Sequence, residues 1–408
     1  MKKYWTTLLI ITIAAGSFAQ GRKVVFVIVD GIAADVIEKQ PTPFLDAIAK
    51  AGGYARAHVG GEKGGYSQTP TISAVGYNSL LTGTWVNKHN VWDNDIKAPN
   101  YSYWTLFRFL KEQFPQKKTA VFSSWEDNRT KLVGENLPAT GTIKLTHHFD
   151  GLELDTIHYP HDRKRDFMHL IDEAVVENAV DFIRKEAPDL SWVYLEYTDD
   201  MGHAHGDSPE FYRAVDLMDK QMGRLWKTIQ YREKRFKEDW EIYITTDHGR
   251  DAKTGKGHGG QSDRERSTWI VTNAKGLNNY FKTGNPGVVD IMPSIAQFIG
   301  IKIPREQLME IDGIPLTGAL SATDPRAVLT NGKLTVNWKA VSSNGDAKIW
   351  LTTTNRFKDG GRDEYVLVAT VPVSKQEAVI DITDKNSPFY KVVIETKGNF
   401  LNRWVIVK

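Results

Sequence analysis

The sequence predicts an α/β protein with a mostly parallel sheet flanked by helices, followed by a smaller all-β sandwich. Between residues 23 and 299, apolar runs typical of buried strands alternate with helix patterns. After about residue 320 the helix patterns stop, and short apolar runs separated by turn signals follow. Because strands that alternate with helices are typical of a parallel sheet with helices on its faces, the change near residue 320 indicates a second domain of another class.

The first strand is predicted at residues 23–29, with the sequence KVVFVIV, and it ends at Asp30 and Gly31. A continuous apolar run of this kind is typical of a central parallel strand that is buried on both faces. A helix follows, with Thr42 as its cap, Pro43 at its first position and a pair of glycines as its stop.

The later segments continue the alternation and complete a domain that we place at residues 20–320. We expect strands at residues 119–123, 192–197, 240–246 and 268–271, and helices at residues 166–185, 209–229 and 288–299. Residues 321–325 then read as a linker, because Ser, Asp and Pro favour irregular backbone.

The second domain is predicted at residues 326–408 as a β-sandwich. Its strands are expected at residues 333–338, 348–352, 365–371, 378–382, 390–395 and 404–407. Turn signals such as Asn331-Gly332 separate these runs, and short strands at this spacing are typical of a sandwich. No catalytic cluster is apparent in this part of the chain.

The composition is that of a globular protein and excludes several classes of site. Hydrophobic residues make up 41% and charged residues 25% of the 408 residues, which is enough apolar material for a core. The net charge of +2 gives no reason to expect a nucleic acid polymer as a partner. The absence of cysteine excludes disulfides, thiolate nucleophiles and cysteine-based zinc sites.

The N-terminus has the pattern of a secretory signal peptide over residues 1–19. Lys2 and Lys3 precede a compact apolar run at residues 8–15, and small residues lead to a cleavage site after Ala19. The run is shorter than the roughly 20 residues that a membrane span requires, which favours cleavage over an anchor. No later run predicts a span, so we expect export across the inner membrane to a bacterial periplasm or cell surface.

Polar residues that could carry chemistry follow several predicted strands. They are Asp30, Ser73 with Thr82-Gly83, Asp199 with His203, Asp247-His248, and His258 between glycines. Ligands bind at the carboxyl ends of the strands in open α/β sheets, and carboxylates with imidazoles suit zinc-like divalent ions. Each segment alone fits an ordinary loop or a structural histidine, whereas the combination favours a shared metal site.

These residues resemble the alkaline phosphatase superfamily, and within it the type I phosphodiesterase and nucleotide pyrophosphatase family, over residues 23 to about 318. In that family a Thr or Ser nucleophile lies nine residues before a Thr-Gly pair and twenty-one residues before an Asn. The pair at residues 82–83 points back to Ser73, and Asn94 stands at the Asn position. Thr71 is the competing nucleophile, but its spacing differs by two residues.

The resemblance implies an α/β domain of the alkaline phosphatase type with two divalent ions, for which zinc is the expected metal. One ion would take Asp199, His203 and His258, and the other would take Asp30, Asp247, His248 and the Ser73 oxygen. Asp200 could replace Asp199, but the four-residue step to His203 favours Asp199. Paired ions about 4 Å apart can hold both the attacking and the leaving oxygen of a displacement.

The implied reaction is phosphoester hydrolysis through a phosphoryl-serine. A serine hydroxyl needs activation, and Ser73 would begin a helix whose dipole favours a negative oxygen. Asn94 and the backbone N–H of Ala74 would stabilise the non-bridging oxygens. The alternatives are a phosphomonoesterase on the same site and a binding protein without activity.

The substrate is predicted as a small-molecule phosphoester, with a phosphodiester or nucleotide first. Nucleotide-cleaving members often carry an aromatic residue after the nucleophile, where this chain has Ala74. Tyr194 stands at a second base-stacking position but fits a core strand equally well. The basic run at residues 163–165 fits a solvated surface better than a phosphate grip. Trp125, Glu126 and Asp127 follow a predicted strand without an assignable role.

The C-terminal domain resembles a fibronectin type III domain. The runs at residues 334–338 and 390–393 carry this resemblance. Such a domain is expected to pack on the catalytic domain or to contact glycans or the cell surface.

Overall fold

The structure is a computed structural model that describes residues 21–384 and 387–407. The predicted signal peptide at residues 1–19 lies outside the described residues.

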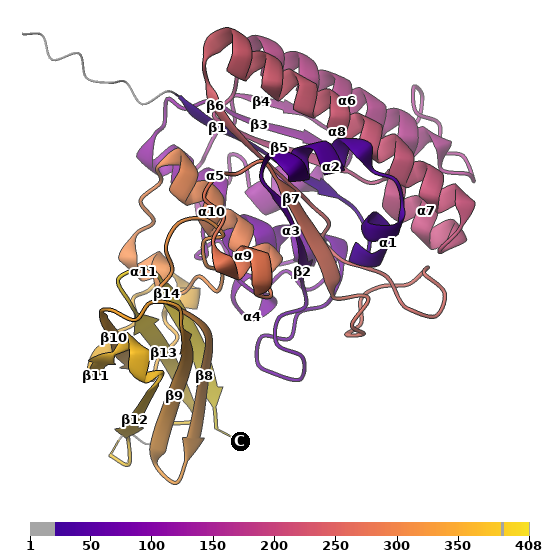
Figure 1. The fold of residues 1–408 in the computed structure, drawn as a ribbon. Coiled ribbons are helices and arrows are strands. Elements are labelled where there is room, and N and C mark those ends of the chain that lie inside the picture. Colours follow the sequence, from indigo (N-terminus) through magenta and orange to yellow (C-terminus); the bar gives the residue numbers. More distant parts are fainter. Residues whose placement is uncertain (1–20, 385–386, 408) are drawn as a thin grey trace, which may run out of the picture.

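A seven-stranded sheet forms the centre of the N-terminal region (Figure 1). Its strand order is β2-β7-β6-β1-β5-β3-β4, with β1 parallel to both β5 and β6. At one edge β7 runs antiparallel to β6, and β2 runs antiparallel to β7. The strands are β1 Arg22–Val29, β2 Gly53–His58, β3 Thr119–Ser123, β4 His147–Phe149, β5 Leu190–Leu195, β6 Asp239–Thr245 and β7 Ser267–Thr272.

Helices cover both faces of this sheet, as the sequence predicts. On one face α6 and α8 lie side by side and pack with α2, and on the other face α3, α5 and α10 lie against the strands (Figure 1). The helices of this region are α1 Ala34–Lys39, α2 Pro43–Ala51, α3 Ser73–Thr82, α4 Val86–His89, α5 Leu106–Gln113, α6 Asp166–Glu186, α7 Tyr197–His205, α8 Pro209–Phe236, α9 Asn279–Thr283, α10 Ile291–Ile299 and α11 Arg305–Leu308.

Strand β1 shows why its sequence is apolar throughout. Val25, Val27 and Val29 belong to the core under α6 and α8, whereas Phe26 and Ile28 belong to the core under α3 and α10. Successive side chains of a strand point to opposite faces, so a strand covered on both sides needs an apolar residue at every position.

The C-terminal β-region, residues 322–407, consists of two antiparallel sheets, β11-β10-β13-β14 and β12-β9-β8, with a separate hydrophobic core between them. Its strands are β8 Ala322–Thr330, β9 Lys333–Ala340, β10 Asp346–Thr352, β11 Val366–Pro372, β12 Glu377–Asp381, β13 Phe389–Glu395 and β14 Phe400–Ile406. The two-sheet class agrees with the prediction, and the likeness to fibronectin type III stays a prediction.

The predicted linker at residues 321–325 differs from the structure, because β8 already begins at Ala322. The pairing of β8 with β9 shifts register between Thr323 and Arg326, and this bulge includes Pro325. A bulge leaves a residue unpaired, so it accepts a proline that has no N–H for the ladder. The composition that suggests a linker therefore belongs to an irregularity within a strand.

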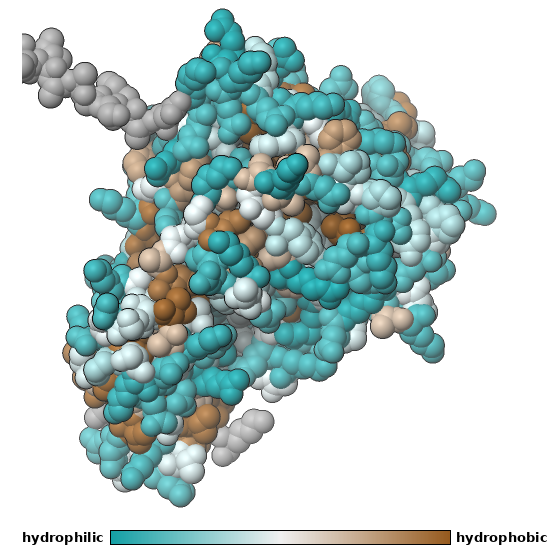
Figure 2. All heavy atoms as spheres, viewed as in Figure 1, coloured by the Kyte–Doolittle hydropathy of each residue, from teal (hydrophilic) through white to brown (hydrophobic). Residues whose placement is uncertain are grey.

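On the face shown in Figure 2, hydrophilic residues cover most of the surface, and hydrophobic residues also appear at the surface of the C-terminal β-region. Val328, Val366, Val379 and Ile406, which lie on its edge strands, are more than half exposed. Among the described residues, no helix combines the length and the apolar character needed to cross a membrane.

Candidate metal and catalytic centre

Three carboxylates meet at the carboxyl edge of the parallel strands. Asp30 directly follows β1, Asp247 follows β6 by two residues, and Asp199 lies in the first turn of α7 after β5. Since β6, β1 and β5 are neighbours in the sheet, their carboxyl ends bring these side chains together. All three carboxylates are buried.

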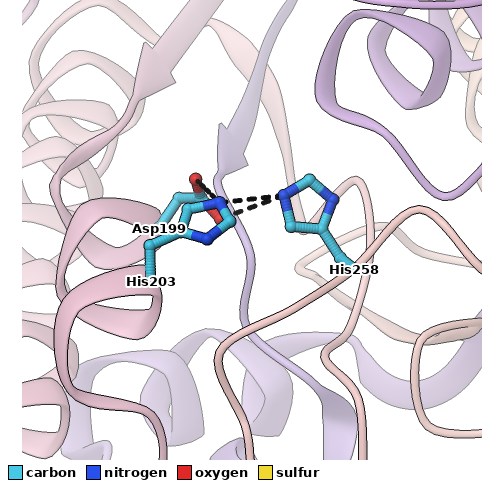
Figure 3. A group of neighbouring side chains, drawn as sticks. All are labelled: Asp199, His203 and His258. Atoms are coloured by element: carbon cyan, nitrogen blue, oxygen red, sulfur yellow. Dashed lines mark hydrogen bonds and ion pairs between the residues drawn. The ribbon is translucent and has the colours of Figure 1, made fainter.

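The first group of possible metal ligands is Asp199, His203 and His258 (Figure 3). His203 Nε2 lies 3.2 Å from Asp199 Oδ2 and 3.0 Å from His258 Nε2. One ligand atom of each residue lies within 4.8 Å of the other two. The two rings come from α7 and from the loop after β6, and they face each other beside the carboxylate. This is the set that the resemblance implies for one ion.

The second group surrounds His248. Its Nε2 lies 3.3 Å from Asp30 Oδ1, 3.2 Å from Asp247 Oδ2 and 3.4 Å from Ser73 Oγ. Ligand atoms of Asp30, Asp199 and His248 also lie within 4.8 Å of one another. The structure therefore places all four residues predicted for the second ion around one imidazole nitrogen, and it adds Asp199 as a neighbour of both groups.

Hydrogen bonds from the other ring nitrogen orient two of these histidines. His248 Nδ1 lies 2.9 Å from the carbonyl of Gly249, and His258 Nδ1 lies 2.9 Å from the carbonyl of Thr71. A carbonyl only accepts, so each Nδ1 carries the proton and a neutral ring offers the lone pair of Nε2. This arrangement is typical of histidines that bind metals.

The environment of Ser73 differs from that of its competitor Thr71. Ser73 begins α3 and is buried, with its hydroxyl beside His248 Nε2. The Thr71 hydroxyl donates to the carbonyl of Gly260 at 3.0 Å and accepts from the N–H of Gly259 at 2.9 Å. The Thr71 hydroxyl thus already donates one hydrogen bond and accepts another, both with backbone groups, so this geometry favours Ser73 as the nucleophile.

Asn94 and Ala74 bind each other. The N–H of Ala74 donates to Asn94 Oδ1 at 3.0 Å, which brings Asn94 next to the start of α3. The structure thus brings both predicted oxyanion groups next to Ser73, the predicted nucleophile. The Ala74 N–H already has an acceptor, so the Asn94 amide nitrogen is the donor more open to a substrate oxygen.

The shared negative charge shows in the pKa values of the centre. Burial, together with the charge of Asp30, raises the pKa of Asp247 well above its usual range. Burial lowers the pKa of His248, but the facing carboxylates of Asp247 and Asp30 outweigh it and raise that pKa to about 9. For His258, burial and the neighbouring His248 lower the pKa to about 4. Neighbouring buried carboxylates contribute to the first two shifts, whereas burial and the neighbouring His248 cause the third.

Two carboxylate oxygens of the centre, Asp30 Oδ1 and Asp247 Oδ2, are buried and accept no hydrogen bond from any described residue. Their neighbour His248 Nε2 is close, at 3.3 and 3.2 Å, but does not point at them with hydrogen-bond geometry. Buried polar atoms without a partner are rare and costly, so they favour a missing ligand. Carboxylate oxygens and imidazole nitrogens are donors that suit zinc.

Tyr194 lies inside the core and not in a substrate cleft. Its hydroxyl donates to Asp30 Oδ2 at 2.8 Å, and its ring is buried beside that of Tyr77. A ring in this position has no open face for a nucleotide base, and the side chain of Ala74 is also buried. Neither predicted base contact is therefore exposed.

Tyr77 and Arg250 belong to the centre, although the sequence analysis did not single them out. The hydroxyl of Tyr77 donates to Asp30 Oδ2, and the guanidinium of Arg250 donates to Asp199 Oδ1. Both side chains are fully buried. A signal for Tyr77 is its place one helical turn after Ser73, and a signal for Arg250 is its place next to the Asp247-His248-Gly249 run.

Arg165 is bound by carboxylates beside the centre. Its Nε lies 2.6 Å from Asp200 Oδ2 and its Nη2 lies 3.1 Å from Glu196 Oε1. These two residues flank the ligand Asp199 on α7 and just before it. Asp200, the alternative ligand, is thus engaged by Arg165, which leaves Asp199 to face the histidines.

The segment without an assigned role lies behind Tyr77. The ring of Trp125 packs edge-on against Tyr77, with centroids 6.3 Å apart. The Glu126 side chain pairs with Arg129, and Asp127 pairs with Lys131. These contacts give the segment a structural role.

Comparisons with known proteins agree with this geometry. The profile of the family described as type I phosphodiesterase / nucleotide pyrophosphatase matches residues 24–261. Human ectonucleotide pyrophosphatase/phosphodiesterase family member 5 is 26% identical over 232 residues, which cover 56% of this chain and 45% of that protein. The chain thus spans about half the length of this relative.

Two solved structures share the fold. A sulfatase candidate from Bacteroides thetaiotaomicron VPI-5482 matches with a TM-score of 0.52 and 11% identity, over 86% of each chain. Ps i-CgsB, solved in complex with k-i-k-neocarrahexaose, matches with a TM-score of 0.52 and 14% identity, over 79% of this chain and 84% of that chain. At these identities the matches show the fold alone.

Proposed function

This chain belongs to the type I phosphodiesterase / nucleotide pyrophosphatase family, and we propose that it hydrolyses small-molecule phosphodiesters with Ser73 as the nucleophile and two divalent cations, zinc first. The relative named above and the family description support a hydrolase of this type. A phosphomonoesterase on the same centre is the alternative.

The observation that carries the proposal is the uncompensated charge around Ser73. Of the three buried carboxylates Asp30, Asp247 and Asp199, Asp199 is the one paired with a guanidinium, that of Arg250, and one oxygen each of the other two accepts no hydrogen bond from described residues. Two divalent cations would turn this local charge from about −2 to about +2, with neutral histidines. A centre of that charge attracts an anionic phosphoester.

The groups of this chain have distinct roles in the proposed reaction. Ser73 Oγ attacks phosphorus and forms a phosphoryl-serine as the alcohol leaves, and water then cleaves the serine ester. The N-terminus of α3 stabilises the negative oxygen of Ser73, and the amide of Asn94 donates to a non-bridging oxygen. Bound divalent cations supply charge neutralisation and lower the pKa of the attacking hydroxyl.

The surroundings support a diester over a monoester. A dianionic monoester needs an additional cationic grip, and two arginines beside the centre are already engaged, Arg165 by Asp200 and Glu196 and Arg250 by Asp199. The two predicted base contacts do not mark a base site, because Ala74 and the Tyr194 ring are buried. The proposal therefore names the phosphodiester group and leaves its substituents open.

The test compares Ser73→Ala with wild type on bis(p-nitrophenyl) phosphate and p-nitrophenyl phosphate. Loss of the nucleophile should lower kcat about 10³-fold or more, with the zinc content near normal. Ser79→Ala, in the same helix but bonded to Val75 and His89, is the control for folding. Retained turnover in Ser73→Ala would contradict the assignment of Ser73 as the nucleophile. A large preference of the wild type for the monoester would show that the enzyme is a phosphomonoesterase and not a phosphodiesterase.

We also propose export with cleavage after Ala19, and contact of the C-terminal β-region with glycans or the cell surface. The pattern of residues 1–19 supports export, and the exposed apolar residues on the edge strands support a contact role. Mass spectrometry of the protein from a periplasmic fraction should find Gln20 as the first residue. An intact N-terminus there contradicts cleavage.

A further inference from the structure

Arg250 is a fully buried cation within the cluster of predicted metal ligands. Its Nε donates to the carbonyl of Gly31 at 2.9 Å, and its Nη1 donates to the carbonyl of Lys256 at 3.0 Å. Its Nη2 donates to the backbone carbonyl of Asp199 at 2.8 Å and to Asp199 Oδ1. One side chain thus ties together three segments of the centre.

Each of these segments carries a predicted ligand. Gly31 follows Asp30, Asp199 is itself a ligand, and Lys256 precedes His258 by two residues. The planar guanidinium offers donors in a fixed fork, so it can hold several acceptors in one geometry. Other contacts join the same segments, such as Thr198 Oγ1 to the carbonyl of Asp30 at 2.6 Å and Lys256 Nζ to the carbonyl of Ala204 at 2.9 Å, but Arg250 alone among these groups also holds the Asp199 carboxylate.

Two glycines make room for this guanidinium. A Cβ on Gly202, inside α7 between Asp199 and His203, would collide with the guanidinium of Arg250. A Cβ on Gly31 would also come too close to it, as well as to the Asp199 carboxylate. A glycine inside a helix destabilises it by about 1 kcal/mol relative to alanine. The space that the Arg250 guanidinium needs explains why position 202 is nevertheless a glycine.

The contact with Arg250 also gives the two carboxylate oxygens of Asp199 different partners. Arg250 occupies Oδ1, whereas Oδ2 faces His203 Nε2 at 3.2 Å. The oxygen directed toward His203 is therefore fixed by the arginine and not by the rotation of a free carboxylate, while His258 Nε2 lies 3.9 Å from Oδ1. Partners that orient metal ligands in this way commonly change metal affinity 10- to 100-fold when removed.

We propose that Arg250 is a positioning residue that sets the zinc affinity of the Asp199, His203 and His258 group. The inference rests on the proposed function only in taking this group as a metal site. The arginine acts through its fork geometry, which holds Asp199 and the two flanking loops, and not through its charge, which opposes a second cation.

The experiment measures zinc binding to the metal-free protein by calorimetry, without substrate. His203→Ala identifies the binding step that belongs to this group, because His203 lies in this group alone. Arg250→Met should raise the dissociation constant of that same step about tenfold or more, and that of the other step by less, because Asp199 and the segment of Asp30 also border the second group. Arg250→Lys, which keeps the charge and loses the fork, should weaken the step nearly as much.

A matched control separates this role from general stability. Arg232 is another buried arginine, bonded to Glu238 just before β6 and to the carbonyl of Arg184, whereas the ligands Asp247 and His248 follow the opposite end of that strand. Arg232→Met should lower the melting temperature and leave both zinc constants unchanged.

Three results overturn the inference: unchanged or tighter zinc binding in Arg250→Met, wild-type binding in Arg250→Lys, or an equal loss in Arg232→Met. A wild-type protein that binds two zinc ions but hydrolyses no phosphoester contradicts the proposed function and leaves the role of Arg250 standing. A wild-type protein without zinc binding contradicts both.

Discussion

Two clusters of buried charge lie in this molecule, and they are compensated in opposite ways. At the sheet edge, Asp30 and Asp247 each keep a buried oxygen that accepts no hydrogen bond from described residues. Between the N-terminal region and the C-terminal β-region, the chain supplies its own cations, Lys88 and Lys391, to a group of carboxylates.

The second cluster joins the two regions through short contacts. Lys88 Nζ, from α4, lies 2.6 Å from Asp312 Oδ1 and 2.7 Å from Asn402 Oδ1 on β14. Lys391 Nζ, from β13, lies 2.6 Å from Glu310 Oε1 and 2.8 Å from Asp363 Oδ2. Both lysines are buried. Carboxylates paired with buried lysines indicate a structural role, although Glu310 Oε2 in that cluster also accepts no hydrogen bond from described residues. Asp30 and Asp247 face only the imidazole of His248 as a possible cation, which indicates a ligand site.

The largest effect is expected when the compensated cluster loses a cation. Lys88→Met leaves Asp312 buried without its lysine, which should lower the free energy of unfolding by about 3–5 kcal/mol. Urea denaturation followed by fluorescence measures the change. Lys118→Met is the control, because the pair of Lys118 with Glu186 is solvent-exposed and should contribute at most about 1 kcal/mol. Equal effects of the two substitutions would remove the distinction between the clusters.

In the cluster at the sheet edge, removing a charge should stabilise the metal-free protein instead of destabilising it. The raised pKa of Asp247 means that the metal-free folded state binds more protons than the unfolded state, so stability falls as the pH rises. Asp247→Asn should therefore stabilise the metal-free protein by about 1–3 kcal/mol, more at pH 8 than at pH 5, while weakening zinc binding. Chemical denaturation at both pH values, with and without zinc, measures these changes. A destabilised metal-free variant would show that Asp247 is already compensated.

Proton competition should then govern metal binding. His248 has a pKa of about 9 in the metal-free protein, so at neutral pH zinc must displace its proton. The apparent zinc affinity should rise about tenfold per pH unit between pH 6 and 8, which corresponds to about 1.4 kcal/mol. Calorimetry in buffers of different ionisation enthalpy measures the released protons. An affinity that does not change with pH would exclude His248 as a ligand.

The sequence predicted the part of the centre that depends on chain order. Asp30, Asp199 and Asp247 follow strands whose apolar runs are readable, and parallel strands bring their carboxyl ends to one edge. The same reading found most strands and helices, but it did not find the strands β2, β4 and β8. It also gave no antiparallel direction for β7, because pairing direction depends on contacts distant in sequence.

The roles of residues that depend on tertiary contacts could not be predicted from the sequence. Lys88 lies in a four-residue helix and reads as a surface charge, yet it is buried against residues more than two hundred positions away. Arg250 and Tyr77 are recognisable only once Asp199 and Asp30 lie beside them. Tyr194 has the spacing of a base contact, but its strand faces the core.

The two oxygens of Asp30 differ in the same way as the two clusters, because one has hydrogen-bond donors from the chain and the other has none. The smallest expected effect tests whether this difference matters for stability. Its Oδ2 receives the hydroxyls of Tyr194 and Tyr77, whereas its Oδ1 accepts none. Tyr194→Phe keeps the ring and removes one donor, so it should lower the stability of the metal-free protein by about 0.5–1.5 kcal/mol. Zinc should reduce this loss, because a cation on Asp30 replaces the lost donor as a partner for its charge. Melting curves of wild type and variant, with and without zinc, compare the two losses. An equal loss in both states would mean that the tyrosines compensate Asp30 independently of any cation, and the division between its two oxygens would fail.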